Sequence, residues 1–138
     1  MNRIPVVDPS GAQNQVADIF AEIESAFGKV PNLFRTYAHH PALLEANWRK
    51  VKSLMIQGEL SRKAKETIAV LVSKDNGCDY CVAAHETALR AIGVSGEEIQ
   101  AIEQDLEKAG FDRKEKALIE FARKANIAPL RIEDEEVK

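Results

Sequence analysis

The sequence has few of the features that mark secreted, membrane-spanning or nucleic-acid-binding proteins. Its 138 residues include only two cysteines, too few for the disulfide framework of a small secreted domain. No segment approaches the ~18 consecutive apolar residues of a membrane span, and the N-terminus lacks the apolar run of a signal peptide. The net charge is −3, and no basic stripe is interleaved with aromatic residues. We therefore predict a cytoplasmic protein that neither enters a membrane nor binds nucleic acid.

Strand-like alternation is also missing, and the apolar residues recur instead at helical spacing. The length fits one domain over residues 1–138, with its core at about 41–125. Glycine, proline and capping residues divide this domain into helices, so we predict an all-α bundle. The predicted helices cover residues 13–27, 32–39, 41–55, 62–73, 78–93, 95–109 and a last segment from residue 112. In that last helix we expect an inward face made of Ala117, Leu118, Phe121 and Ala122.

The two cysteines occur together in the segment CDYCVAAH at residues 78–85, which ends in a histidine. If this segment begins a helix, Cys78 and Cys81 share a face, and so do Cys81 and His85. Cys78 and His85 are then roughly 10 Å apart along the helix axis. Because helical side chains lean toward the N-terminus, His85 can reach Cys81 and hardly Cys78.

This geometry gives the two thiols unequal surroundings. Cys78 lies at the helix N-terminus, where unpaired N–H groups and the helix dipole favour a thiolate. Cys81 has a local base in His85. A thiolate attacks peroxides and disulfides, and the sulfenic acid formed from a peroxide condenses with a neighbouring thiol. The segment therefore predicts dithiol redox chemistry.

A carboxylate on the preceding helix, Glu66, lies twelve residues before Cys78. The turn at residues 75–77 should pack the two helices antiparallel. Contact between Glu66 and His85 is compatible with this packing but not required by it. Such a contact would orient the imidazole ring and assist it in moving protons.

Two other interpretations of the cysteine pair stay open. The thiols could be inert, buried apolar groups, or they could form half of a zinc site. Zinc normally takes four ligands. Cys78, Cys81 and His85 supply three, and His39 or His40 would have to supply the fourth. We expect no metal and no cofactor.

Taken together, these residues resemble a known family. The spacing Glu66–Cys78–Cys81–His85 is similar to the active-site signature of the alkyl hydroperoxidase D-like (AhpD-like) branch of the carboxymuconolactone decarboxylase family. Four further segments resemble that branch's peroxidase-related subgroup: RIPVVDP at 3–9, FGKVPNLF at 27–34, NGC at 76–78 and KALIEFARK at 116–124. The resemblance extends through nearly the whole chain.

The resemblance implies an AhpD-like helical bundle with the cysteine motif at the N-terminus of a core helix. It also implies a homo-oligomer (trimer, hexamer or dimer) and an antioxidant thiol peroxidase or disulfide reductase. Its substrates would be a hydroperoxide and an external dithiol. Carried over residue by residue, Cys81 is the peroxidatic cysteine, Cys78 the resolving one, and His85 with Glu66 the proton relay.

The chain departs from the family pattern in two places. The classical enzyme has a histidine directly before the second cysteine, where this chain has Tyr80, a possible site-lining residue. Tyrosine donates hydrogen bonds but accepts protons poorly near neutral pH. Members of the subgroup usually continue for several more helices, whereas this chain stops at Lys138. We expect either a trimmed form or a short form that completes its core from a partner chain.

Two alternative functions remain at this point. One is the lyase chemistry of the family's decarboxylase branch, whose members generally lack the cysteine pair. The other is a non-enzymatic helical module that binds metal or forms a disulfide without catalysis.

Overall fold

The computed structural model describes residues 3–137, and within this range it contains helices and turns but no β-strand. The all-α prediction is therefore confirmed. Contacts divide the chain into two compact units, Met1–Gly58 and Glu59–Lys138. The prediction of one domain with its core at 41–125 stays a prediction.

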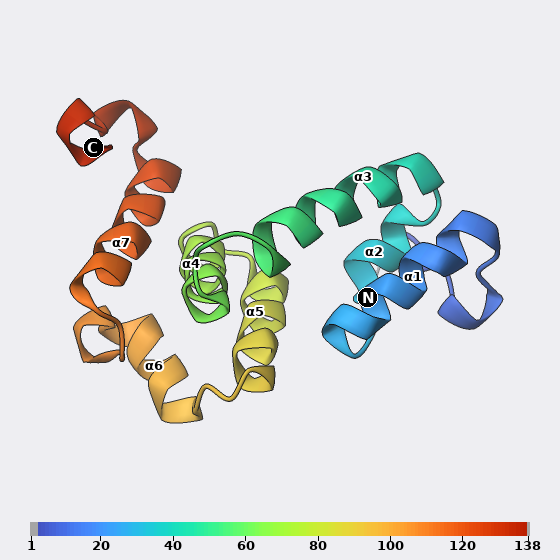
Figure 1. Cartoon of the computed structure of the whole chain (residues 1–138), viewed down its shortest axis with the longest axis horizontal. Helices are drawn as coiled ribbons and strands as arrows, with labels where there is room; N and C mark the ends of the chain where they lie inside the picture. Colours follow the sequence, from blue (N-terminus) through green and yellow to red (C-terminus); the bar gives the residue numbers. More distant parts are fainter. Residues whose placement is uncertain (1–2, 138) are drawn as a thin grey trace. The chain divides into compact units, whose positions relative to one another are not determined.

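The described part of the first unit contains the α-helices α1 (Asn14–Phe27), α2 (Asn32–Tyr37) and α3 (Pro41–Val51) (Figure 1). A 3-10 turn, Pro9–Gly11, precedes α1, and a π-helical turn, Lys52–Ile56, follows α3. Its core gathers around Trp48, whose ring contacts those of Phe27 and Phe34 edge-on, each at a centroid distance of 5.7 Å. The indole Nε1 donates to Glu22 over 2.9 Å, so the polar edge of this buried ring is satisfied.

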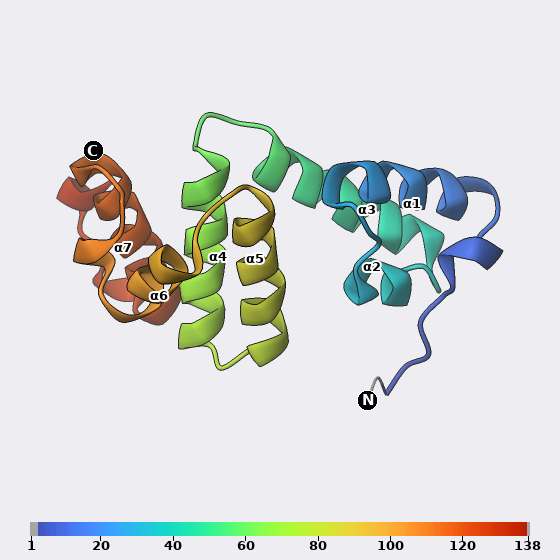
Figure 2. The same ribbon diagram turned by 90° about the horizontal axis from the view of Figure 1, so that it is seen from below.

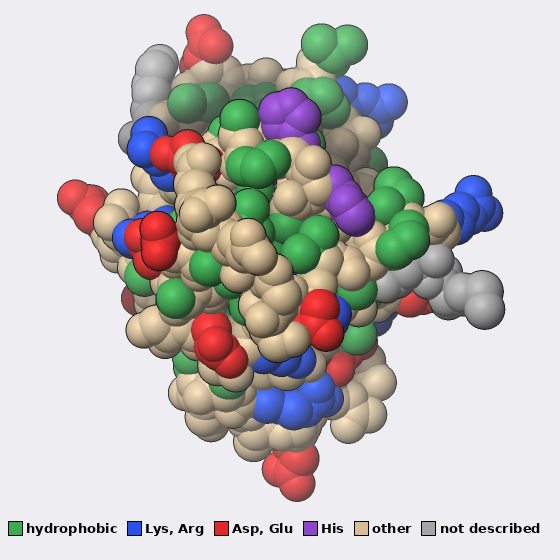
Figure 3. All heavy atoms as spheres, turned by 90° about the vertical axis from the view of Figure 1, so that its right-hand side faces the viewer, with side chains coloured by type: hydrophobic (Ala, Val, Ile, Leu, Met, Phe, Trp, Pro, Cys, Tyr) green, Lys and Arg blue, Asp and Glu red, His purple; other side chains and the backbone are tan. Residues whose placement is uncertain are grey.

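Apolar side chains are also present on the surface of this unit, where they lie among acidic and basic ones (Figure 3). The exposed large apolar residues of the first unit are Ile4, Leu33, Leu43, Leu54 and Ile56. Single exposed apolar side chains are normal on folded proteins, and this distribution alone identifies no site.

The second unit contains α4 (Arg62–Asp75), α5 (Asp79–Ala91), α6 (Gly96–Gln104) and α7 (Arg113–Ile127). Figure 2 shows α4 and α5 side by side, joined by a tight turn at one end. On the other side α4 packs against α7. Three short 3-10 turns, Leu106–Lys108, Pro129–Arg131 and Asp134–Glu136, complete this part of the chain. The helix α4 is thus the central element of the second unit.

The buried face of α7 differs from the predicted one. Ile119 is completely buried and joins the core cluster with Val70 and Leu89. Ala117 is exposed, and the other three residues of the predicted inward face are only half-buried. The prediction was wrong because several phases of this helix carry apolar residues at helical spacing, and only packing selects one of them.

Two predicted helix ends were also wrong. The helix predicted over 41–55 ends as α-helix at Val51, and its last turn is π-helical, with Gln57 N donating to Lys52 O. The helix predicted over 95–109 ends at Gln104, because Asp105 leaves the helical conformation and its side chain caps the next turn at Glu107 N. Aspartate favours such caps over helix interiors.

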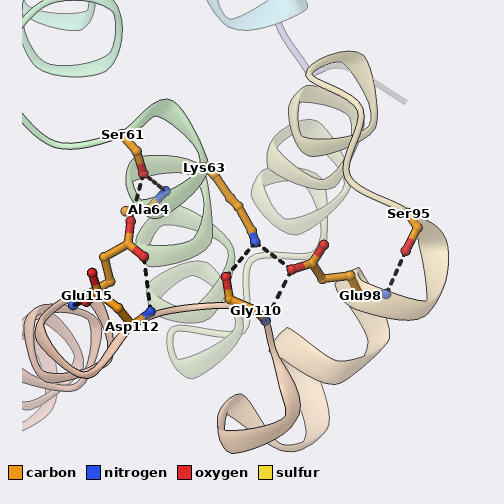
Figure 4. Close-up of polar contacts among 8 residues, drawn as sticks. All are labelled: Ser61, Lys63, Ala64, Ser95, Glu98, Gly110, Asp112 and Glu115. Atoms are coloured by element: carbon orange, nitrogen blue, oxygen red, sulfur yellow. Dashed lines mark hydrogen bonds and ion pairs between the residues drawn. The ribbon is translucent and has the colours of Figure 1, made fainter.

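A polar cluster ties α4, α6 and the segment before α7 together (Figure 4). Lys63 on α4 donates to Glu98 of α6 over 2.5 Å and to Gly110 O over 3.1 Å. The same Glu98 oxygen accepts from Gly110 N, and the Lys63 ammonium lies 4.4 Å from the centre of the Phe111 ring. A Cβ at Gly110 would lie 2.9 Å from Glu98 Oε1, so a larger residue here would displace the Glu98 carboxylate from its present position.

The helix starts in this region are capped as their sequences predict. Ser61 Oγ accepts from Ala64 N at the start of α4 and donates to Glu115 on α7. Asp112 and Glu115 form a capping box that starts α7. The start of α4, the helix that carries Glu66, is therefore held by its own cap and by a hydrogen bond to α7.

Candidate functional site

The turn between α4 and α5 places the cysteine motif at a defined helix start. Gly77 adopts a left-handed conformation with φ of 67°, which few side-chain-bearing residues take, and it directly precedes Cys78. Two hydrogen bonds from Arg123 on α7 to the carboxylate of Asp75 brace the turn. These bonds lower the pKa of Asp75 below its ordinary value of 3.8. The sequence predicts the end of one helix and the cap of the next within residues 75–77; α4 does end at Asp75, but the cap of α5 is Cys78.

The two cysteines are joined by a disulfide across the first turn of α5, with their Cα atoms 5.3 Å apart. Cys78 is the N-cap residue, and its Sγ accepts a hydrogen bond of 3.3 Å from the backbone N–H of Cys81. Both residues are half-buried. The predicted placement of the motif at a helix N-terminus is thus confirmed, and the pair lies where it can form an intramolecular disulfide.

The structure brings Glu66 and His85 together, although the sequence left this contact open. Glu66 Oε2 lies 2.6 Å from His85 Nδ1, and the carboxylate is 1% exposed. The imidazole ring therefore lies between the buried carboxylate and the half-exposed edge of the α4–α5 pair. Because Nδ1 faces the carboxylate, Nε2 is the ring nitrogen directed away from it.

A third group on this line of contacts, Arg62, was missed by sequence reasoning. Its Nε lies 2.6 Å from Glu66 Oε1, the oxygen that does not contact His85. Arg62 is one turn before Glu66 on α4, and the i,i+4 spacing of an arginine and a glutamate is a signal that could have revealed the pair. Glu66 therefore has a nitrogen partner on each oxygen.

Tyr80, the predicted site-lining residue, lies on α5 between the cysteines and is 52% exposed. Its side chain faces solvent to a large extent. A role in the chemistry stays a prediction.

The histidines considered as a fourth zinc ligand belong to the first unit and have local partners. His39 Nε2 lies 2.7 Å from Pro5 O. His40 Nδ1 accepts from Leu43 N and so caps α3. Within residues 3–137 no cluster of three or more histidine, cysteine or acidic side chains has the arrangement of a metal site.

Within the same range, no helix combines the length and the apolar character that crossing a bilayer requires. The predicted cytoplasmic location, the expected homo-oligomer and the absence of a nucleic-acid partner stay predictions.

Comparison with solved structures finds the same fold in proteins of related sequence. A peroxidase-related protein of Silicibacter sp. is 28% identical, with a TM-score of 0.83 over 99% of this chain and 71% of the other. A peroxidase-related protein of Ralstonia eutropha, described as an alkylhydroperoxidase AhpD core, is 28% identical, with a TM-score of 0.82 over 98% of this chain and 72% of the other. The predicted AhpD-like fold is confirmed.

A third structure, the debrominase Bmp8 in complex with 2,3,4-tribromopyrrole, has a TM-score of 0.81 over 99% of this chain and 73% of the other. It is only 20% identical, so the likeness concerns the fold alone.

Among curated proteins, an alkyl hydroperoxide reductase of Mycobacterium tuberculosis is 33% identical over 93 residues. The match covers 67% of this chain but only 27% of that relative. The model of the carboxymuconolactone decarboxylase family matches residues 41–124, more than half of the chain, and includes the cysteine pair, Glu66 and His85. The chain therefore belongs to the carboxymuconolactone decarboxylase family, as its motif predicted.

Proposed function

We propose that this protein is a thiol-dependent peroxidase that reduces hydroperoxides through a dithiol–disulfide cycle at Cys78 and Cys81. One observation carries the proposal: a disulfide-forming cysteine pair at a helix start is followed, one turn later, by a histidine whose ring contacts a buried carboxylate. The names of relatives that include a hydroperoxide reductase and AhpD-core proteins support the same reaction class. Members of the lyase branch generally lack the cysteine pair, and a non-enzymatic module has no need of the contact between the histidine and the carboxylate.

In the proposed cycle Cys81 is the peroxidatic cysteine, because His85 lies one turn after it on the same helix. His85 Nε2 takes the thiol proton, and the thiolate attacks the distal oxygen of the hydroperoxide. The O–O bond breaks, Cys81 becomes a sulfenic acid, and the leaving alkoxide takes the proton from His85 as an alcohol.

Cys78 then acts as the resolving cysteine. Its thiolate, favoured by the N–H groups at the start of α5, attacks the sulfur of the sulfenic acid. The S–O bond breaks as the disulfide forms, and the departing hydroxide takes up a proton and leaves as water. An external dithiol reduces this disulfide by thiol–disulfide exchange and is itself oxidised, which returns both cysteines to thiols. Glu66 orients the His85 ring throughout.

The decisive experiment counts free thiols in the reduced protein before and after one equivalent of cumene hydroperoxide. The wild type should lose both thiols and release cumyl alcohol. Cys78→Ser should retain a trappable sulfenic acid at Cys81, and Cys81→Ser should consume no peroxide. Peroxide consumption that is unchanged in both single variants would refute the proposal.

Two histidine variants, one in the proposed relay and one outside it, test the role of His85. His85→Gln should slow disulfide formation by about 100-fold or more, the usual loss when a general acid–base group is removed. His39→Gln changes a histidine of the first unit, bound to Pro5 O, and should leave the rate unchanged. Equal rates for both variants would remove His85 from the mechanism.

A further inference from the structure

The negative charge of the buried Glu66 carboxylate must be balanced by a neighbouring group. A carboxylate that is 1% exposed requires a cation or several hydrogen bonds to stay ionised. His85 could supply the cation, but a protonated imidazole has no lone pair to accept a further proton. With a second cation beside Glu66, His85 need not be protonated to balance the charge of the carboxylate.

Arg62 has the position and the chemistry to be that cation. Its Nε contacts Glu66 Oε1 at 2.6 Å, while His85 contacts Oε2, so the two partners use different oxygens. The guanidinium of arginine stays protonated at all working pH values. The Arg62 side chain is 27% exposed, and its ion pair with Glu66 is therefore shielded from much of the solvent.

We propose that Arg62 is a positioning residue of the peroxidase site, which balances the charge of Glu66 so that His85 stays neutral and basic. This inference rests on the proposed function for its catalytic consequence. With Arg62 and Glu66 balanced, His85 donates Nδ1–H to Glu66 and keeps Nε2 as a proton acceptor for Cys81. Without Arg62, the carboxylate favours the imidazolium form, which cannot take the thiol proton.

Several charged groups of the second unit pair with one another, whereas the guanidinium of Arg62 contacts Glu66. These groups are Glu86 with Arg90, Glu103 with Lys74, Lys63 with Glu98 and Asp75 with Arg123. Lys63, Lys74 and Asp75 belong to α4 itself, and their partners lie on α6 and α7, which pack against α4.

The test follows the ring signals of His85 by NMR as a function of pH in the disulfide form, in which neither cysteine titrates. The chain has only three histidines, so a His85→Gln spectrum assigns the signal. In Arg62→Gln, His85 should reach its neutral form at a higher pH than in the wild type. Arg62→Lys keeps the charge and should restore the titration largely to that of the wild type.

Arg90→Gln is the matched control, because Arg90 also pairs with a glutamate four residues away, but with Glu86 rather than Glu66. It should leave the His85 titration unchanged. Unchanged titration in folded Arg62→Gln would overturn the proposal. Should Arg62→Gln not fold, folding of Arg62→Lys supports charge balance, and loss of folding in both variants overturns it in favour of a purely structural guanidinium.

The catalytic consequence is read from the pH profile of disulfide formation with cumene hydroperoxide. In Arg62→Gln the acid limb should move to higher pH, with a rate about tenfold lower near pH 6 and little changed in alkaline solution. An unmoved acid limb contradicts the inference. If the wild type itself forms no disulfide with peroxide, the proposed function fails, while the NMR titration still decides the role of Arg62.

Discussion

Truncation of Ile119 tests the packing of α7, the element whose buried face the sequence did not reveal. Ile119 is 0% exposed and belongs to the core cluster of the second unit. Ile119→Ala removes three carbons, and the lost transfer free energy is about 0.8 kcal/mol for each. Adding the cavity left behind, we expect the free energy of unfolding to fall by about 2–5 kcal/mol.

Leu118→Ala is the matched comparison, because it also removes three carbons but from a half-buried side chain. It should cost only about 1 kcal/mol. Urea unfolding followed by far-UV circular dichroism reports the helices of both units. The fluorescence of Trp48, the single tryptophan, reports the core of the first unit. A larger loss for Leu118→Ala than for Ile119→Ala would refute the packing of α7 described above.

Two further predictions concern the turn before Cys78. Asp75→Asn should lower the free energy of unfolding by about 1 kcal/mol near neutral pH. Because Arg123 lowers the pKa of Asp75, this contribution is present above the unfolded value near 3.8 and is lost as the pH falls through the folded pKa. Acid titration of both proteins should therefore show convergent stabilities at low pH, and a gap that persists there would contradict the assignment. Gly77→Ala should cost about 1–2 kcal/mol in thermal unfolding, since φ is 67°. Gly96→Ala, at a glycine with open space and an ordinary φ, should be neutral or slightly stabilising, so equal effects would count against strain at residue 77.

The sequence predicted the parts of the site that depend on spacing along one helix. The relation of Cys78, Cys81 and His85 follows from the helical repeat once a helix start is known. The start itself was signalled by Gly77, whose left-handed backbone suits the end of the preceding helix. Helical spacing was enough to predict this part of the site, because these residues all lie on α5 or in the connection directly before it.

Contacts between helices could not be predicted from helical spacing. The meeting of Glu66 with His85 depends on the register of α4 against α5, and the sequence allowed more than one register. The family resemblance, rather than the helical pattern, drew attention to Glu66. The inward face of α7 was mispredicted for a related reason, since apolar residues at several phases of one helix leave the choice to tertiary packing.

The burial of Glu66 is itself an argument for chemistry at this site. An ion pair between packed helices adds little net stability, because desolvation offsets most of the attraction, and apolar residues of similar volume often serve the fold as well or better. Glu66 belongs to the buried residues of α4, together with the apolar Val70 and Leu71. The two oxygens of its carboxylate instead contact a permanent cation and an imidazole ring. A fold alone does not need that pairing, whereas the proposed peroxidase needs it to orient one imidazole nitrogen and to keep the other available to the thiol one turn away.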